Sequence, residues 1–157
     1  MEQAMTPISI GALARWIFGE LDNRRTVLGI PKENFAVPRA QIAMPLLGAT
    51  LAAPLGVAAG PHTQLAQNIV AAWLCGARFM ELKTVQVMDE IHVPRPCIDV
   101  LDEGYNCEWS QELRIDESFR EYLNAWVLIH ALAGRLGLAG PGTLFAMSVC
   151  YDLAGVQ

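Results

Sequence analysis

Charge is scarce in this sequence, and the little that is present leans acidic. Only 17% of the 157 residues are charged, the net charge is −5, and 53% of the residues are hydrophobic. The basic residues are scattered apart from Arg24 and Arg25, so the chain lacks the basic patch that a phosphate backbone requires. Nucleic acid is therefore not an expected partner, whereas one compact domain with a sizeable core is expected.

Long hydrophobic runs are also absent, although the mean hydropathy is +0.29. No window approaches eighteen uninterrupted apolar residues, so no membrane span is expected. The amino-terminal stretch carries the acidic Glu2 and has no basic region followed by an apolar core, so a secretory signal is not expected either. Together these absences favour a cytoplasmic location.

The sequence has few cysteines, and it lacks the common metal and phosphate motifs. Its four cysteines show no CxxC spacing, which excludes a local zinc knuckle or iron–sulfur loop and leaves reduced thiols as the expected state. Neither GxGxxG nor GxxxxGK followed by Ser or Thr occurs, so no dinucleotide fingerprint or P-loop is predicted. Asp99, Asp102 and Glu103 are acidic neighbours, which are more typical of a solvated loop than of a metal site. No metal is predicted.

The amino-terminal part predicts a helix, a linker and a hairpin. Residues 9–25 place Leu13, Ile17 and Leu21 on one helical stripe behind a possible N-cap, Ser9. A proline-punctuated linker follows, and residues 42–54 predict two short strands around a turn at residues 47–48.

From residue 54 onward, strands and helices alternate. Apolar stretches at residues 54–61, 79–87 and 143–153 predict three strands, and residues 63–78 predict a helix that Thr63 caps. Ser118 and Glu121 have the spacing of a capping box at the start of a second helix that ends near Gly137. The tryptophans are expected in the core. This alternation predicts an α/β fold with a parallel sheet.

Parallel sheets bind ligands at the carboxyl ends of their strands, and polar residues stand at one predicted end. Lys83 and Thr84 close the second strand, where the ammonium can stabilise anionic charge and the hydroxyl can donate or accept. The small residues after the first strand, Ala58 and Ala59 among them, let a flat ligand approach the backbone. The alternative is that Lys83 pairs with Glu81 or another acidic residue at the rim.

These segments resemble a known family. The stretch "AAGPHTQLAQNIVAAWLCGARFMELKTVQ" is similar to the start of the FMN barrel of dihydroorotate and dihydropyrimidine dehydrogenases. It is most similar to the N-terminal region of the family called "putative selenate reductase subunit". The hairpin and the later pieces "CIDVLDEGYNCEWSQEL", "YLNAW" and "FAMSVCYDLAG" extend the resemblance over the chain. It implies a flavin-dependent oxidoreductase built on a (β/α)8 TIM barrel.

The resemblance also implies roles for individual residues. It places Ala58 and Ala59 against the flavin and gives Lys83 and Thr84 contacts to FMN, and its best match for a substrate-facing asparagine is Asn106. An amide suits a ring with alternating carbonyl and N–H groups, and a nearby cation suits the negative charge of a reduced flavin. The alternative for Asn106 is an ordinary turn residue. No catalytic acid or base is assigned.

The length of the chain sets a limit on this interpretation. A closed barrel needs about 250 residues, so we expect a helix and linker at residues 1–38 and only the first strands and helices of a barrel at residues 39–157. FAD, iron–sulfur clusters and other electron-transfer domains or subunits are expected outside this chain. Self-association through open strand edges is also expected. Two rival hypotheses are an inactive interaction or assembly segment and a flavin-free barrel for a phosphorylated metabolite.

Overall fold

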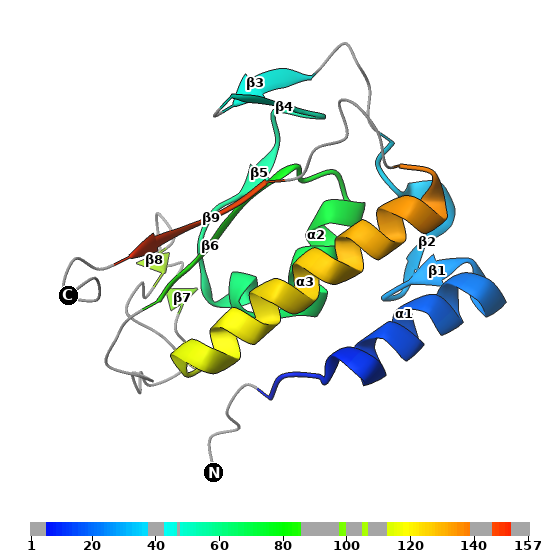
Figure 1. Cartoon of the computed structure of the whole chain (residues 1–157), viewed down its shortest axis with the longest axis horizontal. Coiled ribbons are helices and arrows are strands. Elements are labelled where there is room, and N and C mark those ends of the chain that lie inside the picture. Colours follow the sequence, from blue (N-terminus) through cyan, green and yellow to red (C-terminus); the bar gives the residue numbers. More distant parts are fainter. Residues whose placement is uncertain are drawn as a thin grey trace.

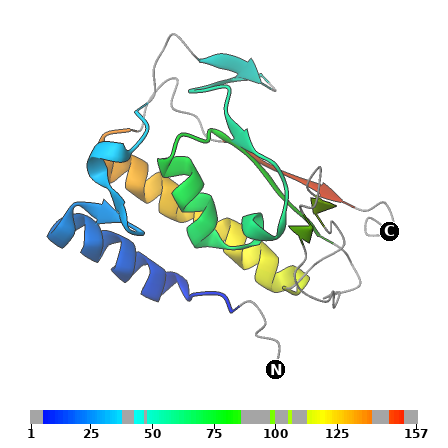
Figure 2. The ribbon, with the colours of Figure 1, turned by 180° about the vertical axis from the view of Figure 1, so that it is seen from behind.

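The computed structural model describes residues 6–37, 43–46, 48–85, 98–99, 105–106, 113–138 and 146–151. Its centre is a three-stranded sheet in the order β5-β6-β9, formed by β5 (Gly56–Val57), β6 (Phe79–Val85) and β9 (Ala146–Tyr151). Both pairings are parallel. Helices α2 (Ala66–Leu74) and α3 (Ile115–Leu136) connect the successive strands and lie on one side of the sheet (Figures 1 and 2). The predicted α/β alternation with a parallel sheet is confirmed.

The amino-terminal helix packs onto the helical layer. Helix α1 (Ile10–Arg24) begins where predicted, with the Ser9 hydroxyl accepting from the Ala12 backbone N–H at 3.4 Å. Its predicted stripe of Leu13, Ile17 and Leu21 is buried. Trp16 departs from the prediction, because it is 45% exposed and its indole N–H donates to Glu20. It lies off the buried stripe, so helical spacing places it toward solvent.

Two small antiparallel hairpins precede the central sheet. The first, β1 (Thr26–Val27) with β2 (Ile30–Pro31), falls where only a linker was expected, and it is followed by a 3₁₀ turn (Lys32–Asn34). The second, β3 (Met44–Leu46) with β4 (Ala49–Leu51), is the predicted hairpin. Gly48 in its turn has a φ of +80°, a conformation that glycine adopts without strain.

A third small hairpin, β7 (Ile98–Asp99) with β8 (Tyr105–Asn106), occurs in the stretch interpreted as a loop. It lies beside the carboxyl ends of β6 and β9 in both views of the chain (Figures 1 and 2).

The starts of α2 and α3 differ from the sequence prediction. Helix α2 begins at Ala66, and the Thr63 hydroxyl instead bonds Gly60 in a preceding 3₁₀ turn (Pro61–Gln64). Helix α3 begins at Ile115, where the Glu117 carboxylate accepts from the backbone N–H of Arg114 at 3.0 Å. The predicted capping box is therefore wrong: Ser118 and Glu121 lie inside the helix and are buried. Residue spacing in the sequence could not show whether Glu117 or Glu121 caps the start of α3.

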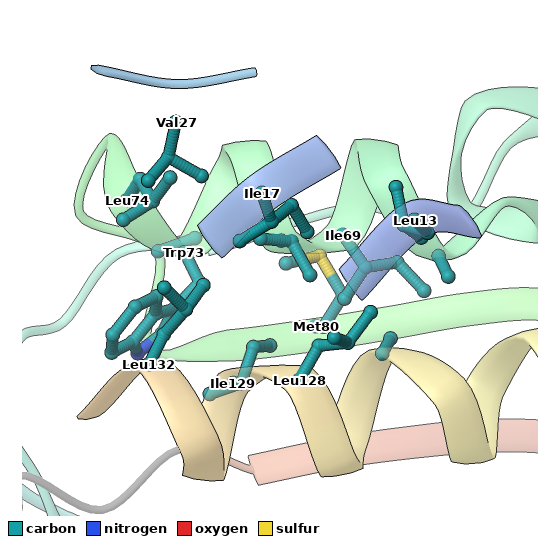
Figure 3. Packing of buried hydrophobic residues seen from close by; sticks show 14 of the residues in the cluster. Leu13, Ile17, Val27, Ile69, Trp73, Leu74, Met80, Leu128, Ile129 and Leu132 are labelled. Carbon is teal, nitrogen blue, oxygen red and sulfur yellow. The ribbon is translucent and has the colours of Figure 1, made fainter. Parts of the chain in front are cut away.

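One hydrophobic core joins the helices to the sheet. Figure 3 shows side chains from α1, α2, β6 and α3 pointing toward one another. Met80 of β6 is fully buried among them, and Leu82 is 5% exposed in the same cluster. Of the helices that the structure describes, none is both long enough and apolar enough to cross a membrane.

A buried carboxylate links α3 to the start of α2. Glu121 is 2% exposed, and its Oε2 accepts from the Ala66 backbone N–H at 2.7 Å. Burial raises the pKa of this carboxyl group, while the hydrogen bonds from Ala66 and Asn124 offset part of that rise. The side chain thus satisfies a backbone donor at the α2 terminus, at the cost of burying an ionisable group.

The core assignment predicts different outcomes for two leucines of α3. Leu128 is 2% exposed and belongs to the core cluster, whereas Leu123 is 49% exposed. Leu128→Ala should lower the free energy of unfolding by about 2–5 kcal/mol because it leaves a cavity. Leu123→Ala should change it by less than about 0.5 kcal/mol. Urea denaturation measures both, and equal losses would contradict the assignment.

Because Glu121 is buried, the stability difference between wild type and a Glu121→Gln variant should depend on pH. Because its folded-state pKa is raised, the favourable contribution of Glu121 is complete below its unfolded pKa and is lost as pH rises through the folded pKa. Glu121→Gln should therefore gain stability relative to wild type as pH rises over that window, since the amide oxygen can still accept from Ala66. Denaturation curves at several pH values measure this difference, and Glu33→Gln, at an exposed position, is the control. A difference independent of pH would contradict the assignment.

Candidate functional site at the carboxyl ends of the strands

The carboxyl ends of the three parallel strands lie along one edge of the sheet. Strand β5 ends at Val57 and continues into Ala58, Ala59 and Gly60, while β6 ends at Val85. Because β5 pairs directly with β6, the small residues after β5 and the end of β6 belong to the same edge. This is the edge at which parallel sheets bind ligands.

The two faces of β6 have different surroundings. Met80 and Leu82 enter the core on the helical side, and side chains alternate along a strand. Glu81 therefore lies on the face away from the helices, which is the inner side of a barrel, and Lys83 follows two residues later, where the pairing with β9 becomes irregular. Lys83 is only 4% exposed, so its position is buried although its side chain carries a charge.

A β-bulge interrupts β6 between Leu82 and Val85. Leu82 pairs with Val149 and Val85 pairs with Tyr151, so β6 advances three residues while β9 advances two. The extra residue falls within Lys83–Thr84. Bulges redirect side chains and often occur near functional sites, and this one lies at the carboxyl end of its strand.

Tyr122 of α3 holds the bulge from the helical side. Its hydroxyl donates to the backbone carbonyl of Lys83 at 3.0 Å. Burial raises the pKa of the Tyr122 hydroxyl, so it remains a neutral donor over the physiological pH range. The hydrogen bond satisfies the Lys83 carbonyl and ties the end of β6 to α3.

Glu81 holds the segment after β5. Its Oε2 accepts from the Ala59 backbone N–H at 3.1 Å, across a separation of 22 residues. The Thr63 hydroxyl then closes the next turn, because it accepts from the Gly60 N–H at 3.2 Å and donates to the Gly60 carbonyl at 3.0 Å. These bonds fix the backbone on both sides of residue 60.

The backbone positions of most of the predicted site residues therefore lie at one edge of the sheet. Ala58 is exposed and Ala59 is half-buried, directly beyond β5 and linked to β6 through Glu81. Thr84 lies in β6 at the bulge, and its side chain lies outside the described parts. Asn106 lies in β8, whose hairpin is beside the strand ends (Figure 1), and its side chain likewise lies outside the described parts.

Sequence reasoning missed two residues of this arrangement. Glu81 was considered only as a partner for Lys83, yet it binds the Ala59 backbone. Its position two residues before Lys83 was the available signal, because both then lie on one face of a strand. Tyr122 gave no comparable signal, since its contact with Lys83 spans 39 residues.

A large cavity that the structure describes lies at the opposite ends of the strands. It measures about 760 Å³ and is lined by residues that precede β5 and β6, including Pro54, Leu55, Gly76 and Arg78. Arg78 is 2% exposed and donates to the carbonyls of Trp73, Ala77 and Ala36. These bonds stabilise loops there, so the guanidinium has a structural role. Among the described residues, no cluster of His, Cys, Asp or Glu could hold a metal ion.

Comparisons with known proteins agree with this architecture. Residues 28–157 match the family model "Oxidoreductase YgfK, N-terminal TIM-barrel domain". The whole chain is 44% identical over 159 aligned residues to a protein of Escherichia coli strain K12 named "Putative oxidoreductase YgfK". The same identity holds for the protein of that name in Escherichia coli O157:H7.

The relatives are much longer than this chain. The alignments cover the whole chain, which spans only 15% of the length of either relative. The two βα units of the structure thus correspond to the first part of a TIM barrel, as predicted, and the chain belongs to the YgfK family of N-terminal TIM-barrel domains.

Proposed function

We propose that this chain forms the first part of a flavin-binding barrel in an oxidoreductase, with FMN held at the carboxyl ends of β5 and β6. The observation that carries the proposal is Lys83, a buried lysine at a bulge near the carboxyl end of β6. The names of the family and of its E. coli relatives support a redox role.

The surroundings of Lys83 suit an anionic, planar group. Lys83 already makes a further interaction within the chain, and an ammonium has three donors, so it can also serve a ligand that carries negative charge or hydrogen-bond acceptors. The pyrimidine portion of a reduced flavin carries such charge and offers carbonyl oxygens to a donor. A lysine held in a dry position by a fixed backbone would stabilise that charge more strongly than a lysine in water would.

The segment after β5 suits the flat face of such a group. Ala58 and Ala59 carry only methyl groups, and Glu81 keeps the Ala59 N–H occupied and the backbone fixed. A ring could therefore lie against this segment without displacing a large side chain. Bound FMN would supply hydride or electron transfer, whereas the residues described here would bind and orient it.

The substrate side is proposed from Asn106. An amide there could donate to and accept from a pyrimidine-type ring with adjacent carbonyl and N–H groups, and the β7–β8 hairpin that carries it lies beside the strand ends. A selenium oxyanion is a second substrate class, which rests on the sequence resemblance alone. Electrons would pass to FAD or iron–sulfur clusters in other domains or subunits.

A barrel fusion tests the proposal. In it, this chain is followed after Gln157 by the remainder of the barrel domain of the E. coli K12 relative. We expect the fusion to retain FMN absorption after desalting. Lys83→Met should weaken FMN binding roughly tenfold or more, because a hydrogen bond from a charged group is worth about 1.5–3 kcal/mol. Lys32→Met is the matched control, since Lys32 is exposed in a 3₁₀ turn.

The outcomes separate the rival functions. A fusion that folds but binds no FMN contradicts the proposal, and tight binding of a sugar phosphate instead would favour the flavin-free barrel. If Lys83→Met lowers the free energy of unfolding but leaves FMN affinity unchanged, Lys83 serves a structural ion pair. Should the fusion not fold, the E. coli protein with Met at the position aligned with Lys83 gives the same comparison.

Removing the Tyr122 hydroxyl should affect the same site indirectly. Tyr122→Phe removes the bond to the Lys83 carbonyl and should cost about 1–2 kcal/mol of unfolding free energy, because a buried acceptor loses its partner. As a positioning residue, it should also shift the flavin reduction potential in the barrel fusion, although it lies on the other side of β6. Spectroelectrochemical titration measures that shift. An unchanged potential would limit Tyr122 to a structural role.

A further inference from the structure

The cavity at the amino-terminal ends of the strands contains a buried positive charge. Arg78 lines this cavity of about 760 Å³ and is 2% exposed. Burial lowers the pKa of its guanidinium, yet an arginine side chain keeps its proton in proteins. No ion pair among the described residues includes Arg78. A full positive charge therefore lies in the wall of the cavity without an anion to compensate it.

Neutral groups hold the guanidinium in place. Its Nη1 donates to the carbonyls of Trp73 and Ala77 at 2.8 and 2.9 Å, and its Nη2 donates to the Ala36 carbonyl at 3.0 Å. Its central carbon lies 5.4 Å from the centroid of the Trp73 ring. These bonds use at most three of the five N–H donors of a guanidinium. The side chain is thus fixed before a ligand binds, and it can still donate to a carboxylate.

The rest of the cavity wall is mainly apolar. Val37 is 67% exposed and Leu55 is 55% exposed, and both line the cavity together with Phe35 and Pro54. Small-molecule sites typically have volumes of about 300–1,000 Å³ and apolar walls with a few polar groups. Because Arg78 is buried and Val37 and Leu55 reach the surface, a ligand would place its charged group deep and its apolar body at the mouth.

Glu33 limits the number of negative charges that the ligand can carry. It lines the same cavity and is exposed in the 3₁₀ turn that follows β2. One carboxylate held by Arg78 is attracted to the guanidinium, whereas a second carboxylate near the mouth would be repelled by Glu33. The charges of the cavity therefore favour a ligand with a single carboxylate.

We propose that this cavity is a second binding site, which takes a small monocarboxylate with an apolar body. The carboxylate would accept from Arg78, and the apolar body would lie against Val37 and Leu55. The cavity lies at the strand ends opposite those proposed for FMN, so this inference does not depend on the flavin proposal. An acidic side chain from the additional length of the relatives is the competing occupant.

Cys75 is a natural reporter for this site, because it is exposed and lines the cavity. Hexanoate is the probe, and hexanamide, which has the same shape but no charge, is the matched control. Alkylation rates with iodoacetamide are read for individual peptides by mass spectrometry, with the other cysteines as internal references. We expect hexanoate to slow the alkylation of Cys75 selectively. Its Kd should be roughly tenfold or more below that of hexanamide, because its carboxylate bonds a charged donor.

Two leucine variants locate the bound probe. Leu55→Ala removes part of the exposed apolar wall and should weaken hexanoate binding roughly threefold or more. Leu123→Ala, at an exposed position of α3 that does not line the cavity, should leave the Kd unchanged. Neither side chain contributes to the bonds that hold Arg78, so both variants should fold.

The alternative outcomes are distinct. Equal affinities for hexanoate and hexanamide would overturn the proposal, because Arg78 would then add nothing to recognition. An unprotected Cys75, slowing at every cysteine, or equal weakening by both leucine variants would also overturn it. The E. coli K12 relative, with cysteine at the position aligned with Cys75, should show the same protection by hexanoate. A thiol there that is already protected and does not respond to hexanoate would identify a segment of the relative as the occupant and contradict the proposal.

Discussion

The alternation of side chains along β6 is the constraint on which the rest of this structure depends. Met80 and Leu82 enter the core shared by α1, α2 and α3, which obliges Glu81 between them to face the other way. A slip of one residue would place this carboxylate in the core and expose the core's centre. Stability of the helical layer and presentation of the site are therefore set by the same register.

Contacts from both neighbours reinforce this register at the functional end. Tyr122 binds the Lys83 carbonyl from the helical side, and Glu81 binds the Ala59 N–H after β5. The bulge between Leu82 and Val85 contains the carbonyl that Tyr122 binds, and Glu81 lies just before it. A charged residue is thus held on a rigid strand, which suits a site that must orient a ligand precisely.

The sequence was sufficient where a single periodicity dominates. The stripe of Leu13, Ile17 and Leu21 predicted α1 correctly, and the apolar runs predicted β6 and β9. It was insufficient where several residues satisfy one rule: Glu117, and not Glu121, caps α3. The β1–β2 hairpin was missed because its strands have two residues each, too few to show alternation.

The place of the candidate residues in the fold was predictable, but their supporting contacts were not. Parallel strands end at a common edge, which sufficed to place Lys83 and Ala59 there, whereas the bonds to Glu81 and Tyr122 arise from tertiary packing over 22 and 39 residues. The most direct measurement is a structure of the barrel fusion with FMN bound. The account predicts the Lys83 ammonium within hydrogen-bonding distance of the flavin ring. A Lys83 that instead pairs with a protein carboxylate, with FMN bound elsewhere, would contradict it.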